Sequence, residues 1–131
     1  MTRTARRQRI TTAALLLAAA AACAEPVSFK DDVVPLLTTR CVVCHVEGAD
    51  QAHLSLFPDA WAQLVGVAST ESPLKRVEPG AAARSYLYLK LLGTQAAAGG
   101  SGARMPFQQD ALAPADIDVV RKWIEQGARQ N

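Results

Sequence analysis

The stretch Cys41-Val42-Val43-Cys44-His45 carries the strongest signal in the sequence. Two cysteines separated by two residues, with a histidine directly after the second, form the pattern that attaches haem c covalently. In a helical turn, residues three and four apart project from one face, so Cys41, Cys44 and His45 can reach the same porphyrin. The two thiols would form thioethers and the imidazole would supply the proximal iron ligand. The spacing therefore predicts one covalently bound haem c and its iron.

Other uses of paired cysteines fit this sequence less well. A redox-active thiol pair belongs in a βαβ context, and no alternating strand pattern occurs here. A structural zinc site needs four ligands, yet beyond residue 24 only His53 remains as a further cysteine or histidine. A disulfide between the two cysteines would persist after export, but it leaves the adjacent histidine unexplained.

The sixth iron ligand has two candidates, Met105 and His53, and an open site is the third possibility. Met105 is the only methionine beyond residue 24, and it lies in a glycine-bearing stretch over residues 93–113 that has no periodic pattern. Such a long loop in a small domain usually has a function. A methionine in the core would belong to a helical stripe, whereas Met105 stands beside Pro106 in the loop. We therefore predict Met105 as the distal ligand, which would raise the reduction potential relative to a second histidine.

Helical periodicity and capping signals mark several segments, and no segment alternates as a strand would. The segments are one from about Ser28 that is divided at Pro35, one over residues 58–65, one over residues 81–92 and one over residues 114–127. Ser28 and Asp31 have the spacing of a capping box, and Gly93 and Gly127 are expected to end the last two helices. The pattern predicts a small all-α domain.

Residues 1–24 have the composition of a secretory leader. Four arginines and no acid precede an apolar stretch rich in alanine and leucine, which is short for a membrane span and ends in small residues. We expect this leader to be removed, leaving a periplasmic domain over residues 25–131 without a transmembrane segment. Cys23 offers an alternative, because a cysteine at this place can carry the lipid of a membrane-anchored lipoprotein.

The net charge changes sign when the leader is removed. The whole chain has 14 basic and 12 acidic residues, whereas residues 25–131 keep 10 basic and 12 acidic residues. The basic balance therefore belongs to the leader, and the mature domain lacks the charge that nucleic acid or an anionic membrane would select. No nucleic-acid partner is expected. A domain of this size buries only a modest core, which a bulky apolar cofactor would enlarge.

A series of short motifs runs in order through residues 25–131. They are Ser28-Phe29, Val34-Pro35-Leu36-Leu37, the haem motif over residues 41–45, Gly48 with Leu54-Ser55-Leu56, Val77-Glu78-Pro79-Gly80, Ser85-Tyr86-Leu87, Met105-Pro106 and Trp123-Ile124-Glu125-Gln126-Gly127-Ala128. Together they resemble the class I c-type cytochromes, and among these the single-haem domains of the planctomycete type. The resemblance implies a small cytochrome c fold whose N- and C-terminal helices cross beside one haem, with Met105 as distal ligand.

Two positions depart from the pattern of that family. Ala113 stands where a serine or threonine usually caps the last helix, and Phe107 stands where a second proline usually follows Met105-Pro106. Neither position is a ligand.

These features predict an electron-transfer protein whose iron cycles between Fe(III) and Fe(II) with His45 and Met105 as axial ligands. The alternative is a haem enzyme or gas sensor, such as a peroxidase, which needs an open or displaceable sixth position. Met105 argues against that alternative. The protein is not expected to be an enzyme itself, although it can serve as the electron-donating subunit of an oxidoreductase. Redox proteins are the expected partners, and the sequence does not identify them.

Charged residues near these motifs are interpreted as solvated. Arg104 is close to Met105 and could bind a haem propionate, but a solvated loop arginine is the preferred interpretation. Lys75 and Arg76 could help to dock a redox partner, although such surface pairs are usually only hydrated.

Overall fold

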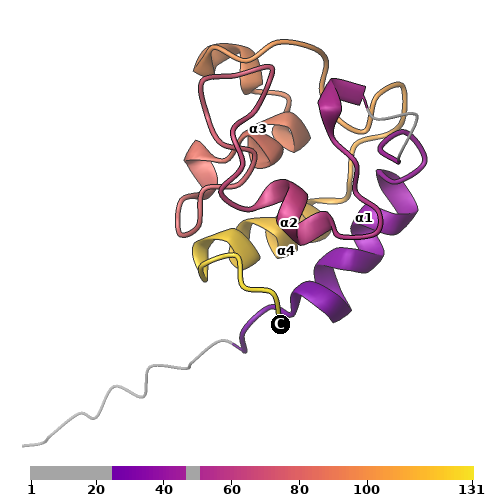
Figure 1. Cartoon of the computed structure of the whole chain (residues 1–131), viewed down its shortest axis with the longest axis vertical. Helices are drawn as coiled ribbons and strands as arrows, with labels where there is room; N and C mark the ends of the chain where they lie inside the picture. Colours follow the sequence, from indigo (N-terminus) through magenta and orange to yellow (C-terminus); the bar gives the residue numbers. More distant parts are fainter. Residues whose placement is uncertain (1–24, 47–50) are drawn as a thin grey trace, which may run out of the picture.

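The computed structural model describes residues 25–46 and 51–131, and within them the chain is helical. The leader predicted over residues 1–24, with Cys23, and Gly48 lie outside the described residues. The helical segments are the π-helical turn η1 (Phe29–Val33), helix α1 (Val34–Arg40), the 3₁₀ turn η2 (Gln51–His53), helix α2 (Ala60–Leu64), the 3₁₀ turn η3 (Ala82–Arg84), helix α3 (Tyr86–Leu92), the 3₁₀ turn η4 (Gln95–Ala98) and helix α4 (Pro114–Glu125) (Figure 1). No strand forms in this part of the chain, where only isolated bridges such as Val65 with Val77 occur. The prediction of an all-α chain is confirmed for the described residues.

The first helical region has the two pieces that its proline predicts. The Ser28 side chain caps η1, because its Oγ accepts a hydrogen bond from the Asp31 N–H at 3.1 Å. Pro35 lies in the first turn of α1, where the missing N–H needs no partner. The helix ends at Arg40, directly before the Cys41 motif.

The prediction of one continuous helix over residues 81–92 is wrong, because the chain breaks at Ser85. This residue has extended backbone angles and is fully buried between η3 and α3. Its Oγ donates to the Ala81 carbonyl at 2.9 Å and accepts from the Glu78 N–H at 2.9 Å. These bonds supply an alternative to the helical hydrogen bonds of the same segment. The loop after Gly93 also contains the 3₁₀ turn η4, which the sequence pattern did not indicate.

Helices α2 and α4 lie where periodicity places them. Helix α4 begins at Pro114 and ends at Glu125, two residues before Gly127, and it buries Trp123 and Ile124. Helix α2 begins at Ala60, two residues later than expected, because the Asp59 side chain accepts the Ala62 N–H and caps the helix there.

The core forms where η1 and α3 pack against α4 (Figure 1). The Phe29 and Trp123 rings stack with their centroids 5.1 Å apart. The other buried apolar residues of the cluster are Val33, Leu37, Leu56, Ala60, Leu64, Val77, Ala82, Leu91, Leu112, Val120, Ile124 and Ala128. Burial of these side chains is the main favourable contribution to folding.

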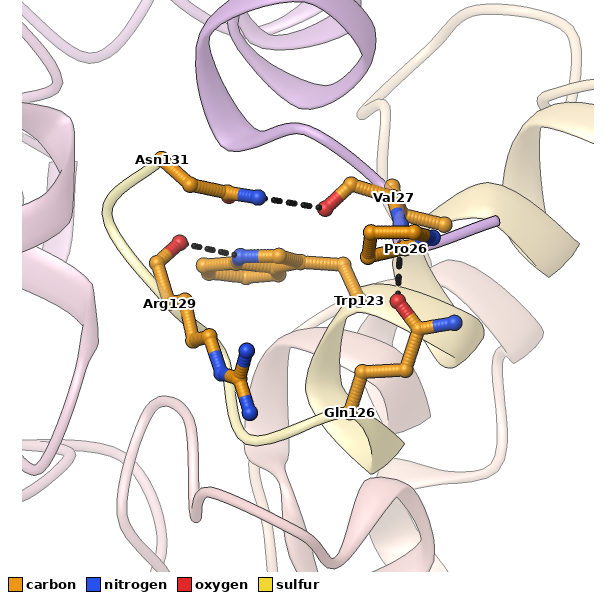
Figure 2. Close-up of a pocket in the computed structure, with 6 residues that line it drawn as sticks. All are labelled: Pro26, Val27, Trp123, Gln126, Arg129 and Asn131. Atoms are coloured by element: carbon orange, nitrogen blue, oxygen red, sulfur yellow. Dashed lines mark hydrogen bonds between the residues drawn. The ribbon is translucent and has the colours of Figure 1, made fainter. Parts of the chain in front are cut away.

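The two ends of the described domain meet beside Trp123. Figure 2 shows the Trp123 indole N–H donating to the Arg129 carbonyl at 2.9 Å, and the Val27 N–H donating to Gln126 Oε1 at 2.7 Å. The Asn131 amide donates to the Val27 carbonyl at 3.4 Å. A hollow of about 250 Å³ lies between these residues. The start of η1 is therefore fixed to the segment that follows α4.

Over the described ranges, no helix has the length and apolar character that crossing a bilayer requires. The longest helix of these ranges, α4, has 12 residues, whereas a membrane span needs about 20. This finding agrees with the expectation for residues 25–131.

Candidate functional site

A cavity of about 440 Å³ brings together the residues that the sequence singles out. Its wall includes Cys41, Cys44, His45 and Met105. Much of the remaining wall is apolar and consists of Leu54, Leu56, Leu64, Leu87, Leu91 and Pro106. The volume lies in the range of about 300–1,000 Å³ that is typical of ligand and cofactor sites.

Tight turns directly after α1 direct the Cys41–His45 motif toward this cavity. The Cys41 N–H donates to the Leu37 carbonyl at 2.9 Å, which joins the motif to the end of the helix. The His45 N–H donates to the Cys41 carbonyl at 3.1 Å, an i to i+4 bond of the α-helical kind. This local turn explains how three residues so close in sequence face one cavity, as their spacing predicts.

The His45 imidazole is oriented by the main chain across from it. Its Nδ1 lies 3.2 Å from the Leu54 carbonyl oxygen, and the His45 carbonyl accepts the Leu56 N–H at 2.7 Å. A carbonyl can only accept, so Nδ1 carries the proton of the neutral ring. The lone pair of Nε2 is then available for a metal, which is the usual arrangement of a ligating histidine.

The two cysteines of the motif are free thiols, and they differ in exposure. Cys44 is exposed, whereas Cys41 is half-buried. Burial raises the pKa of the Cys41 thiol to about 11, with a further increase from Cys44 and an opposing effect of Arg40. Cys41 is therefore a neutral thiol at pH 7. The cysteines of redox-active pairs have lowered pKa values instead, so the environment of Cys41 does not favour that use of the motif.

Met105 reaches the cavity from the loop that connects α3 to α4. Its backbone N–H donates to the Lys90 carbonyl at 2.9 Å, which fixes this part of the loop to α3. His53, the competing candidate, has an exposed side chain and is not among the described residues that line the cavity. Of the two candidates for the sixth ligand, the structure places only Met105 together with His45.

Among the described residues, three cationic side chains line the cavity, and the motifs did not identify them as part of the site. They are Arg40, Arg76 and Lys90, and Glu71 is an acidic residue of the same wall. Arg40 Nη2 donates to the Asp110 carbonyl at 3.0 Å, whereas Arg40 Nε is buried without a hydrogen-bond partner among the described residues. A buried donor of this kind suits an anionic ligand group. The sequence signal that could have identified Arg40 as part of the site is its position directly before Cys41.

The interpretation of Arg76 as a hydrated surface residue is wrong. Arg76 is 8% exposed, and its guanidinium donates to the Gln63 carbonyl at 2.9 Å and to the His53 carbonyl at 2.8 Å. Burial lowers the pKa of this guanidinium. Lys75 does remain exposed, in an ion pair with Glu78.

Arg104 was predicted to be a solvated loop residue, and it is only partly exposed to solvent. It is half-buried, its Nη2 donates to the Gln109 carbonyl at 3.3 Å, and its Nη1 is buried without a partner in the described part of the chain. Arg104 is not among the lining residues of the cavity, so Arg40 is the better placed arginine.

The comparisons with known proteins do not assign the chain to a family. No family model, no curated protein and no solved structure matches it. Within residues 25–46 and 51–131, no group of three or more His, Cys, Asp and Glu side chains could hold a metal ion. A site with one histidine and one methionine as its ligands is not a group of this kind.

Proposed function

We propose that this chain is a c-type cytochrome that carries single electrons between redox proteins. The observation that supports the proposal is the meeting of Cys41, Cys44, His45 and Met105 at one apolar cavity. The small cytochrome c fold belongs to the same proposal, as does the resemblance to the single-haem domains of the planctomycete type. The contact of η1 with α4 is in keeping with it, because the N- and C-terminal helices of that fold cross.

The residues of the cavity fit a covalently attached haem. Cys41 and Cys44 would hold it through thioethers, and His45 Nε2 and Met105 Sδ would be its iron ligands. The buried Nε of Arg40 offers a donor to a propionate. When bound, the haem supplies a one-electron Fe(III)/Fe(II) couple. The leucine side chains of the wall would shield the haem from water, and the Leu54 carbonyl would orient His45 as a ligand.

The first test is the visible spectrum of the full chain expressed with a haem c maturation system. We expect haem that remains attached on a denaturing gel, a c-type spectrum after reduction, and the weak red-edge iron–sulfur charge-transfer band in the oxidised protein. Haem without that band would favour a vacant or different sixth ligand and revive the enzyme or sensor alternative. Rapid, stoichiometric binding of carbon monoxide to the reduced protein at neutral pH would do the same.

Cysteine variants separate covalent attachment from mere binding. Cys41→Ser and Cys44→Ser should each remove one thioether, and His45→Ala should destroy the normal iron site. Cys23→Ser is the matched control, because this cysteine lies in the predicted leader and should leave attachment unchanged. The absence of covalent haem from the wild-type protein would refute the proposal.

The proposal includes export to the periplasm. We expect the intact mass of the periplasmic protein to lack residues 1–24 and to carry no lipid. A mass that retains Cys23 with added acyl chains would instead identify a membrane-anchored lipoprotein. The partners proposed for either form are redox proteins, with no role for nucleic acid.

A further inference from the structure

A buried lysine on α3 lies in the wall of the cavity on the side of Met105. Lys90 is 5% exposed and is the only charged residue of the helix, which otherwise consists of tyrosine and leucine. Burying an ammonium group is costly unless it is paired and hydrogen-bonded. Lys90 has no part in the proposed attachment or ligation of the haem.

Among the described residues, the Lys90 ammonium has three partners, from different parts of the chain. Its Nζ lies 3.6 Å from Glu71 Oε2, donates to the Ser101 carbonyl at 3.2 Å, and stands 5.6 Å from the centroid of the Tyr86 ring. The Glu71 side chain is 31% exposed, so the pair lies at the edge of the interior. A cation above an aromatic face and beside a carboxylate is well compensated.

The same groups fix the segment over residues 99–105, which leads to Met105. The Tyr86 hydroxyl donates to the Ser101 carbonyl at 2.7 Å, and the Ser101 N–H donates to the Glu71 carbonyl at 3.1 Å. Lys90 holds the segment at two points, since its ammonium binds Ser101 and its own carbonyl accepts the Met105 N–H at 2.9 Å. The five residues from Ser101 to Met105 are therefore tied to α3 at both ends.

Two glycines allow the segment to lie directly on these groups. A Cβ at Gly102 would be 2.8 Å from Lys90 Nζ, and φ at this residue is +73°. A Cβ at Gly100 would be 2.4 Å from the Tyr86 ring. A side chain at Gly100 would collide with the Tyr86 ring and the Gln95 carbonyl, and the left-handed φ at Gly102 disfavours a side chain there, so the path of the segment depends on glycine.

We propose that the Lys90–Glu71 ion pair is a positioning device that holds the 99–105 segment against α3 and so keeps the Met105 thioether at the cavity. The inference rests on the proposed function, in which Met105 is the distal ligand. A loosened segment would raise the population in which Met105 has left the iron. A competing ligand would then bind with higher apparent affinity, in proportion to that population.

Displacement of Met105 by added imidazole measures this effect. The haem-loaded protein is titrated with imidazole at pH 7, and loss of the iron–sulfur band reports binding. We expect Lys90→Met to keep covalent haem and to lower the apparent Kd for imidazole about tenfold or more. Lys75→Met is the matched control, because it breaks the exposed Lys75–Glu78 pair, and it should stay within about twofold of wild type.

Glu71→Gln keeps the shape of the acid and should change the Kd in the same direction by a smaller factor. The effects of Lys90→Met and Glu71→Gln should be non-additive in the double variant, because the two residues act on the segment as a unit. If Lys90→Met does not mature, Glu71→Gln decides the question with the same titration. A Kd within about twofold of wild type for the lysine variant, or for Glu71→Gln in its place, would overturn the proposal.

Hydrogen–deuterium exchange gives a readout that does not depend on the iron ligand. Peptides covering residues 99–105 should exchange faster in Lys90→Met than in Lys75→Met, while peptides of α4 stay unchanged. If the wild-type protein shows no iron–sulfur band, the proposed function has failed, and the exchange experiment still decides whether Lys90 holds the segment. Equal exchange in the two variants would show that it does not.

Discussion

The backbone of Met105 holds the loop, and the proposed function gives its side chain a separate role as iron ligand. The backbone N–H binds the Lys90 carbonyl, so the loop keeps its attachment to α3 when the side chain is shortened. We therefore expect Met105→Ala to retain covalent haem while the reduction potential falls by on the order of 100 mV, within the ~0.8 V range that axial ligands span. Redox titration measures this shift, and carbon monoxide should bind the reduced variant rapidly.

His53→Ala is the control for this experiment. Its side chain is exposed and apart from the cavity, so the potential and the iron–sulfur band should stay as in the wild type. A Met105→Ala protein with an unchanged band and potential would refute the ligand assignment. A shift in His53→Ala alone would transfer the assignment to that residue.

Arg40 presents a buried, unpartnered Nε at the cavity wall among the described residues. In the proposed haem site, reduction would add one electron to the iron, and a nearby cation would stabilise the reduced form. Arg40→Gln should lower the potential by tens of millivolts, the size expected for unit charges about 10 Å apart in a medium of effective dielectric constant ~40. Arg84→Gln, which changes an exposed arginine on η3, should have a smaller effect that disappears at high salt. Equal, salt-sensitive shifts in the two variants would contradict the placement of Arg40.

At the scale of elements, the largest fully buried side chain of the described residues is Trp123 on α4. The ring is 1% exposed, stacks on Phe29 of η1, and donates its indole N–H to the Arg129 carbonyl. Trp123→Ala should reduce the free energy of unfolding by about 3–5 kcal/mol. Trp123→Phe keeps most of the packing. It should cost about 1 kcal/mol for the lost hydrogen bond and about 1 kcal/mol for the smaller buried apolar area, roughly 2 kcal/mol in total. Urea unfolding followed by circular dichroism measures these differences.

Trp61→Phe is the matched control on α2. Trp61 is half-buried, and its indole N–H donates to the Ala128 carbonyl at 2.7 Å. Its replacement should cost less than that of Trp123, because less apolar area is lost. If Trp61→Phe proved the more damaging change, burial would not explain the contribution assigned to Trp123.

The elements that sequence reasoning located are those whose signals are local. The apolar period and the proline at position 114 mark α4, and Pro35 marks the division of the first helical region. The break at Ser85 could not be read in this way, because it depends on hydrogen bonds with Glu78 and on the pairing of the next residues with Lys75 and Arg76. Tertiary contacts decide such a site, and helix propensity does not.

In the candidate site, too, the residues with local sequence signals were predicted and those placed by tertiary contacts were not. The Cys41–His45 motif is a local turn, so its spacing predicts which side chains share a face. Met105 was predicted as the sixth ligand because the sequence offers few other candidates. The cations of the wall come from segments that meet only in the fold. Burial of Lys90 and Arg76 contradicts the usual exposure of their residue types, and no periodic pattern signals it.

At the scale of the whole molecule, Asn131 joins the last segment of the chain to the start of the first helical region. Its backbone carbonyl accepts the Lys30 N–H at 2.9 Å, and its side-chain Oδ1 accepts the Phe29 N–H at 2.9 Å. The first N–H groups of a helix have no partner within the helix, so Asn131 supplies what a capping residue would. Asn131→Ala should therefore lower the free energy of unfolding by about 1 kcal/mol.

This loss should be global, because η1 continues directly into α1, which ends at the Cys41 motif. Far-ultraviolet circular dichroism and the haem spectrum should therefore report one coincident unfolding transition, shifted to lower urea in Asn131→Ala. Gln130→Ala, which changes an exposed neighbour, should leave the midpoint in place. Two separated transitions in Asn131→Ala would mean that the two ends of the described domain open independently of the cavity, and the contact beside Trp123 would then be a local one.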